Sequence, residues 1–134
     1  MANEEKGFQK ESINWFPGHM AKARRQIKEN ISMVDIIYEV VDARIPKSSK
    51  IKDINELAKD KPRILIMTKG DLCDLNKTNE WARKYEKEGY KVVLVDLINN
   101  KGTDKVIKVT NEVLADLNKK RVDFIHFFYD TIWI

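Results

Sequence analysis

Three short apolar runs, separated by segments with helical periodicity, constrain the fold of this chain most strongly. They cover residues 36–42, 63–67 and 91–97, within the segments DIIYEVVDAR, RILIM and KVVLVDL. A nearly continuous apolar run rich in β-branched residues is typical of a strand that is covered on both faces. Because strands alternate with helical segments, the sequence predicts an α/β fold with a parallel three-stranded sheet flanked by helices.

Four helices are expected around these strands. Met20, Ala23 and Ile27 show the helical spacing clearly, and charged residues fall on the other faces of the same segment. Ser48 and Ser49 are expected to open a loop. The first expected helix starts at Gly18 and extends through Val34, and the second starts at Asp53 and ends before Pro62. The third covers residues 76–88 and stops at Gly89, and the fourth follows Gly102 with Thr103 as its cap.

Length and composition fit one domain of ordinary size, with 134 residues in all. Apolar residues make up 43% of the chain and charged residues 34%, with 25 Lys and Arg against 21 Asp and Glu. This mildly basic balance permits an RNA or ribosome partner without requiring one. We expect a flexible arm over residues 1–12, a single α/β domain over residues 13–122, and an apolar tail over residues 123–134.

Cysteine content and hydropathy bear on the compartment. The single cysteine, Cys73, has no second cysteine with which to pair, which argues against an oxidising compartment. No apolar run approaches the ~20 residues that span a bilayer, and the opening residues lack the apolar segment of a secretion signal. The sequence therefore predicts a cytoplasmic protein without a membrane partner.

Polar segments follow each of the three predicted strands. They are residues 42–46, 68–71 and 97–102. Ligands of parallel α/β sheets bind beyond the carboxyl ends of the strands. The three polar segments are therefore expected to meet at one edge of the sheet, which we call the rim.

The segment after the second strand has the chemistry to read a guanine base. Asp71 can accept hydrogen bonds from N1 and the exocyclic N2 of guanine, a match that adenine does not offer. Lys69 can lay its methylene stem on the purine face, and Gly70 lets the backbone turn closely between them. A backbone amide near Ile98 can donate to guanine O6. The alternative is an ordinary loop, because a Lys-Gly-Asp turn after a strand is common.

The segment NWFPGHMAKARR, residues 14–25, is a second candidate site. His19 lies at the expected helix start, where its imidazole can face a ligand; a partly exposed histidine without a role is the alternative. Basic residues of the same helix can contact RNA phosphates, although such a face is often simply solvated. The nucleic-acid candidates are Lys22, Arg24, Arg25 and Arg44.

Three motifs resemble one known family. WFPGHMAKARR, VVDARIPKSS and KPRILIMTKGD are similar to the amino-terminal half of the ribosome biogenesis GTPase A family, the circularly permuted GTPases that assist assembly of the large ribosomal subunit. The resemblance covers residues 13 to about 120 in the same order. It implies a partial GTPase-like fold in which the guanine-specificity motif precedes the phosphate loop.

The resemblance also assigns individual residues. The family motif N-K-x-D corresponds to Thr68, Lys69, Gly70 and Asp71, with threonine in place of the usual asparagine. The family's next base-contact loop usually carries a serine-containing turn; this chain has Leu-Ile-Asn-Asn at 97–100, so the contacts there are expected from backbone groups such as that of Ile98. By the same resemblance, His19 matches the histidine proposed to act on the attacking water.

The phosphate-binding half of the family has no counterpart in these residues. The family continues with G-x-x-x-x-G-K-[ST], whose amides and lysine hold the phosphates and whose hydroxyl holds magnesium. We therefore expect weak or absent GTP or GDP binding, no metal site in this chain, Mg²⁺ only with the missing half, and no GTP hydrolysis by this chain alone. The five glycines stand at 7, 18, 70, 89 and 102, and none begins that pattern.

The segment VDFIHFFYDTIWI does not resemble the family. Residues 124–129 are expected to pair with the open edge of the strand at 36–42, in the same chain or in a partner of a homodimer. The leading interpretation is a truncated ribosome-assembly GTPase that contacts the large subunit or its RNA. The alternatives are a nucleotide-independent RNA- or ribosome-binding module and a non-functional remnant.

Overall fold

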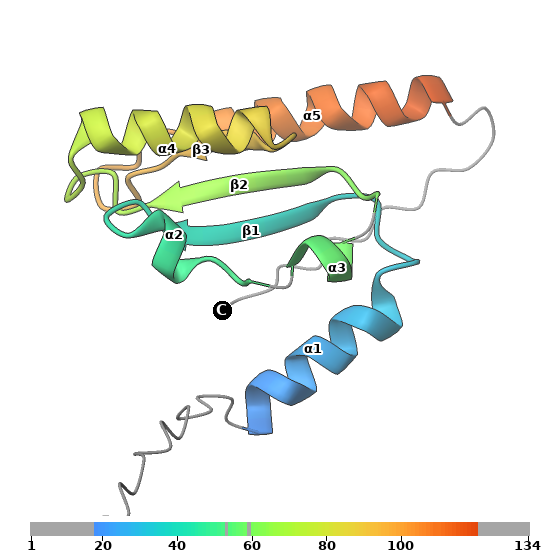
Figure 1. Cartoon of the computed structure of the whole chain (residues 1–134). Coiled ribbons are helices and arrows are strands. Elements are labelled where there is room, and N and C mark those ends of the chain that lie inside the picture. The colour runs from blue at the N-terminus through green and yellow to red at the C-terminus, as the bar shows by residue number, and fades with distance from the viewer. Residues whose placement is uncertain (1–17, 53, 59, 121–134) are drawn as a thin grey trace, which may run out of the picture.

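A parallel three-stranded sheet forms the centre of the molecule (Figure 1). The computed structural model describes residues 18–52, 54–58 and 60–120. The strands are β1 (Ile37–Asp42), β2 (Arg63–Thr68) and β3 (Lys91–Leu94), in the order β1-β2-β3. Both strand pairs are parallel, so the predicted fold class is confirmed.

Five helices accompany the sheet in the described part of the chain. The predicted helices are all found, with ends that differ by a few residues, and one further helical turn was not expected. They are α1 (Gly18–Asn30), α2 (Pro46–Ser49), α3 (Ile54–Ala58), α4 (Leu75–Lys87) and α5 (Thr103–Lys120). None of these helices combines the length and apolar character needed to cross a membrane.

The two faces of the sheet bury alternate residues of β2. Leu65 and Met67 pack on one face against Tyr85 of α4, whereas Ile64 packs on the other face with Val113 of α5. The three β2 side chains have no exposed surface. Complete burial of an aliphatic side chain contributes about 1.5–3 kcal/mol, so β2 supplies the central part of the core.

The N-terminal helix is shorter than predicted. It ends at Asn30, although Ile31 and Val34 still pack in the core with Ile27 of α1 and Leu57 of α3. The spacing of these apolar residues identified the buried face correctly. It did not identify the end of the helix, because Ile31 and Val34 reach the same cluster from the turn that follows α1.

Pro46–Ser49 forms a helical turn where the sequence suggested a loop. Pro46 occupies the start of the turn, where its fixed φ is already helical and its missing N–H is not needed. The Ser49 hydroxyl donates to the carbonyl of Ile45 at 3.0 Å. Its oxygen also accepts from the amide of Asp42 at 2.9 Å, so α2 is tied to the end of β1.

Two details at the end of β3 also differ from the prediction. The regular strand ends at Leu94 rather than at residue 97, and Asp96 pairs instead with Lys101 in an antiparallel bridge. The last helix begins at Thr103, so Gly102 and not Thr103 is in the capping position. The carbonyl of Gly102 accepts from the amides of Lys105 and Val106. Gly102 has φ +85, and an added Cβ would lie 2.4 Å from the carbonyl oxygen of Leu94.

Within the described ranges β1 has one neighbour, so one edge of the sheet is formed by this strand. Residues 124–129, which were predicted to pair with that edge, lie outside the described residues, as do the arm at 1–12 and the whole tail at 123–134. Their pairing stays a prediction.

A buried ion pair joins β1 to the chain that follows α2. Nζ of Lys50 is 3.2 Å from Oε2 of Glu39, and the two side chains are 13% and 3% exposed. The Lys50 amine also contacts the hydroxyl of Tyr90. Burial, and then the charge of Glu39, raise the pKa of Tyr90.

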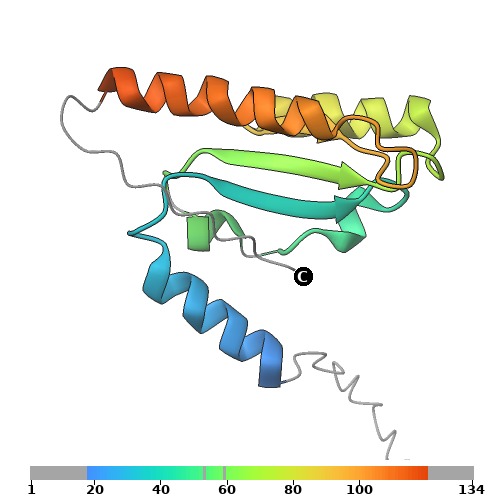
Figure 2. The same ribbon diagram turned by 180° about the vertical axis from the view of Figure 1, so that it is seen from behind.

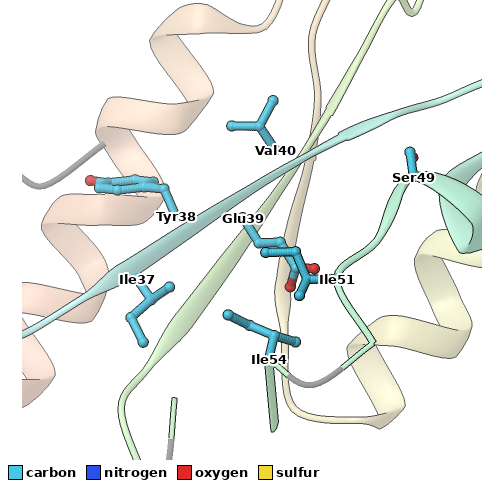
Figure 3. Close-up of a pocket in the computed structure, with 7 residues that line it drawn as sticks. All are labelled: Ile37, Tyr38, Glu39, Val40, Ser49, Ile51 and Ile54. Carbon is cyan, nitrogen blue, oxygen red and sulfur yellow. The ribbon is translucent and has the colours of Figure 1, made fainter. Parts of the chain in front are cut away.

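A cavity of about 10 Å³ lies beside Glu39, with room for about one water molecule. Figure 3 shows the Glu39 carboxyl group next to Ile51 and near Ile54, while Tyr38 points away from this group. The surroundings of the carboxylate are therefore mostly apolar apart from Lys50 and Tyr90.

Candidate functional site

The three loops that follow β1, β2 and β3 lie at the same edge of the sheet, at the left of Figure 1 and the right of Figure 2. The strand register keeps their starting points level. Asp42 at the end of β1 pairs with Thr68 at the end of β2, and Met67 pairs with Leu94 at the end of β3. The predicted rim is therefore present as a structural feature.

Thr68 uses its side chain to fasten the ends of β1 and β2. Its hydroxyl donates to the carbonyl of Val41 at 3.0 Å, and its own carbonyl accepts from the amide of Ala43 at 2.9 Å. The threonine at this position thus supplies a tie between two strands.

Lys69 has an uncommon backbone conformation for a residue other than glycine, with φ +60. Its side chain is 50% exposed, and its Nζ is 3.1 Å from Oδ2 of Asp42. Backbone strain of this kind is found often at ligand-binding sites. Lys69 is therefore held both at its backbone and at its amine.

Asp42 receives more polar contacts than any residue predicted for the site. The side chain of Arg44 donates to Oδ1 from Nε at 3.0 Å and to Oδ2 from Nη2 at 2.7 Å, and the Arg44 amide donates to Oδ1 at 2.9 Å. These hydrogen bonds hold the pKa of Asp42 far below its ordinary value, and Lys69 lowers it further. The same pairing raises the pKa of Arg44.

From the sequence we assigned no separate role to Asp42 and predicted that Arg44 contacts RNA. The structure places Arg44 on the rim, paired with Asp42, and not beside the basic residues of α1. The two residues are only two positions apart, but the sequence carried no signal that their side chains would pair.

Gly70 connects the second rim loop to the third. Its amide donates to the carbonyl of Val95 at 3.0 Å, and a Cβ at this position would lie 3.1 Å from the same oxygen. A side chain here would press against backbone, so the close approach favours glycine. Asp71 follows directly and is exposed on the rim. Its charge contributes to the raised pKa of Arg44.

The third rim loop is organised by Asp96. Its carboxylate accepts from the amide of Asn99 at 3.0 Å and from Asn99 Nδ2 at 2.6 Å. These bonds are the main reason that the pKa of Asp96 is lowered, and the backbone of Ile98 lowers it further. The Ile98 side chain is 81% exposed. The contact of the Ile98 amide with guanine O6 stays a prediction.

The basic helix lies apart from the rim. Figures 1 and 2 show the first turn of α1, which carries His19, separated from the rim loops. His19, Lys22 and Arg25 are exposed, and Arg24 is half-buried. Arg25 lies 3.8 Å from Glu29 one turn along the helix. The structure thus brings Thr68, Lys69 and Asp71 together with Ile98 and Arg44 but leaves the α1 candidates elsewhere.

Comparison with known proteins identifies relatives over most of the chain. No protein-family model matches it. The chain is 41% identical over 104 residues to ribosome biogenesis GTPase A of Bacillus licheniformis, covering 78% of this chain and 37% of the relative. It is 42% identical over 105 residues to the protein of the same name from Priestia megaterium, covering 78% of this chain and 36% of the relative.

A mitochondrial relative is also found. The chain is 35% identical over 102 residues to mitochondrial ribosome-associated GTPase 1 of Bos taurus, covering 75% of this chain and 31% of the relative. The chain thus spans about a third of the length of the curated relatives that it matches. The identity over these residues, together with the motifs at β1 and β2, shows that the chain is related to part of the proteins named ribosome biogenesis GTPase A.

Proposed function

We propose that the rim is a guanine-binding site and that Asp71 gives it its base specificity. The observation that carries this proposal is the arrangement of the second rim loop. Lys69 is held in a left-handed backbone conformation, Gly70 packs against the third loop, and Asp71 is left exposed directly beyond them. An exposed carboxylate beside a fixed lysine stem fits the edge and the face of a guanine base.

The chain supplies base recognition without a phosphate cradle. Its residues contain no G-x-x-x-x-G-K-[ST] pattern. In GTP binding, such a loop and its Mg²⁺ neutralise the phosphates and position them for reaction. We infer that these 134 residues bind GTP or GDP weakly and do not hydrolyse GTP alone. His19 acts on a water molecule only where a phosphate-binding half is supplied, and Mg²⁺ enters with that half.

We infer further that the chain is a truncated form of a circularly permuted GTPase. The names of the relatives support a connection to the ribosome. The large ribosomal subunit and its RNA are the proposed partners, and the cytoplasm is the proposed compartment.

Titration with GDP and ADP, followed by NMR of the ¹⁵N-labelled chain, tests the base specificity. Wild type should bind GDP more tightly than ADP, and Asp71→Asn should weaken GDP binding about tenfold or more, because hydrogen bonds to charged groups contribute roughly 1.5–3 kcal/mol. ADP binding should not change. Asp116→Asn removes an equal charge from an exposed position on α5 and should have no effect.

Several results would contradict this function. Equal affinity of the wild-type chain for GDP and ADP would contradict guanine recognition. Submicromolar GDP affinity or measurable GTP turnover by the isolated chain would show that phosphate binding does not require the missing loop.

The exposed basic residues of α1 support a second candidate function, a nucleotide-independent RNA- or ribosome-binding module. Lys22 and Arg25 are exposed, with Arg24 between them, and Arg44 would have to join them from the rim. If Lys22 and Arg25 both contact phosphates, replacing both by alanine should reduce the salt dependence of binding to ribosomal RNA by a slope of about 1.5. Binding that is unaffected by Asp71→Asn would favour this function over the guanine site.

Within the described residues β1 has no neighbour on one side, and this edge supports a proposed homodimer through the tail. Residues 124–129 are the proposed partner strand for this edge. Analytical ultracentrifugation of the full chain and of a chain that ends at Lys120 tests it. A dimer that is lost on truncation would support the tail contact, whereas two monomers would contradict it. Rapid degradation of the chain in its own cell would instead support a non-functional remnant.

A further inference from the structure

The contact between Asp42 and Lys69 joins two residues that are 27 positions apart in the chain. They meet because β1 and β2 are parallel and in register, with Asp42 opposite Thr68. Nζ of Lys69 lies 3.1 Å from Oδ2 of Asp42. The ion pair therefore connects the first rim loop to the second.

Asp42 is fixed independently of Lys69. Its side chain is 14% exposed and accepts three well-formed hydrogen bonds from Arg44. Its amide donates to the hydroxyl oxygen of Ser49 in α2. An isolated surface ion pair is often too mobile to orient a side chain. Here the acidic partner is anchored on both sides, so the lysine amine is held against a rigid group.

We propose that Asp42 is a positioning residue of the base site, which holds Lys69 so that its methylene stem forms one wall of that site. The left-handed backbone of Lys69 fixes the start of the stem, and Asp42 fixes its end. The apolar stem is then presented as a preformed surface, which lowers the entropy lost when a base packs on it. Asp42 does not touch the nucleotide in this role. The proposal rests on the guanine site described above.

This role differs in its consequences from that of Asp71. Packing on a methylene stem depends on the flat face of the purine and not on its hydrogen-bonding edge. Loss of Asp42 should therefore weaken the binding of guanine and adenine nucleotides by the same factor. Loss of Asp71 should weaken the binding of guanine nucleotides alone. The ratio of the two affinities separates the two residues.

The experiment is a titration of GDP and of ADP into the ¹⁵N-labelled 134-residue chain and its Asp42→Asn variant. Both dissociation constants should rise by up to about fivefold, as expected for a partly exposed ion pair, with their ratio unchanged. In a Lys69→Ala background, Asp42→Asn should have no further effect. Glu29→Gln, which removes the exposed Arg25–Glu29 pair of α1, is the matched control and should leave both constants unchanged.

A second measurement follows the lysine directly without nucleotide. The NMR order parameter of the Lys69 amine should fall in Asp42→Asn and stay the same in Glu29→Gln. An unchanged order parameter would overturn the proposal, as would a nucleotide effect confined to GDP or one that persists in Lys69→Ala. A wild-type chain that binds neither nucleotide would overturn the guanine site and this role with it. The Lys69 order parameter would then still tell whether Asp42 restrains the side chain.

Discussion

The buried pair of Glu39 and Lys50 makes a quantitative prediction about stability. Lys50→Met removes the positive charge and keeps a side chain of similar length. The Glu39 carboxylate, whose side chain is 3% exposed, would then remain buried without its cation. Breaking a buried ion pair on one side destabilises a protein by roughly 3–5 kcal/mol. Because Lys50 retains 13% exposure, we expect a loss near the lower end, about 3 kcal/mol.

Urea unfolding monitored by circular dichroism measures this loss. At a slope of about 2 kcal/mol/M, the midpoint should fall by about 1.5 M. Replacing both residues, as Glu39→Leu with Lys50→Met, should restore the stability to within about 1 kcal/mol of wild type, because neither charge is then buried. Glu29→Gln, which breaks a pair with 71% and 62% exposed side chains, should lose less than about 1 kcal/mol.

Two results would refute this reasoning. The first is a Lys50→Met variant that loses less than about 1 kcal/mol, which would mean that the carboxylate is stabilised by other groups. The second is a double variant that is as unstable as the single one, which would assign the loss to packing around Lys50 and not to the unpaired charge. If Lys50→Met does not fold, the double variant still decides between these explanations.

Three further variants test other parts of the fold. In urea unfolding, Gly102→Ala should lower the free energy of unfolding by about 1–2 kcal/mol more than Gly89→Ala does. Both glycines have positive φ, but only at Gly102 would an added Cβ meet backbone, 2.4 Å from the carbonyl oxygen of Leu94. Asp74→Ala should lose about 1 kcal/mol, since Asp74 caps α4 by accepting from two of its amides. For Asp42, the folded pKa lies below its ordinary value of 3.8, so its stabilising effect is present above that value and is lost as the pH falls through the folded pKa. Between pH 5 and pH 2, Asp42→Asn should therefore lose less unfolding free energy than wild type, and an equal loss would contradict the assigned pairing.

The strands and the positions of the rim loops were predictable because they depend on local patterns. Apolar runs such as RILIM identify buried strands, and parallel strands bring their carboxyl ends to one edge. The base-reading role of the second rim loop was inferred from Lys69, Gly70 and Asp71, and it stays a prediction. These features require no knowledge of which side chains meet.

The contacts within the rim were not predictable, because they depend on register and on close backbone approaches. The pair of Asp42 and Lys69 exists only in the observed alignment of β1 with β2. The early end of β3 accompanies the close approach of Gly102 to the carbonyl of Leu94, which no periodicity reveals. The hydrogen bonds between Asn99 and Asp96 likewise depend on the conformation of the whole loop.

The contacts of the rim bear on our proposal that this chain recognises a guanine base without binding the phosphates. The first loop is tied to the second by Asp42 and Lys69, and the second to the third by the amide of Gly70. The third loop is closed on itself by the bridge between Asp96 and Lys101. Each tie is made by residues from β1 to the start of α5. A preformed site loses less entropy on binding, but it gains nothing from the phosphates that it does not contact. We therefore expect this chain to select a guanine base and yet to bind its nucleotides weakly.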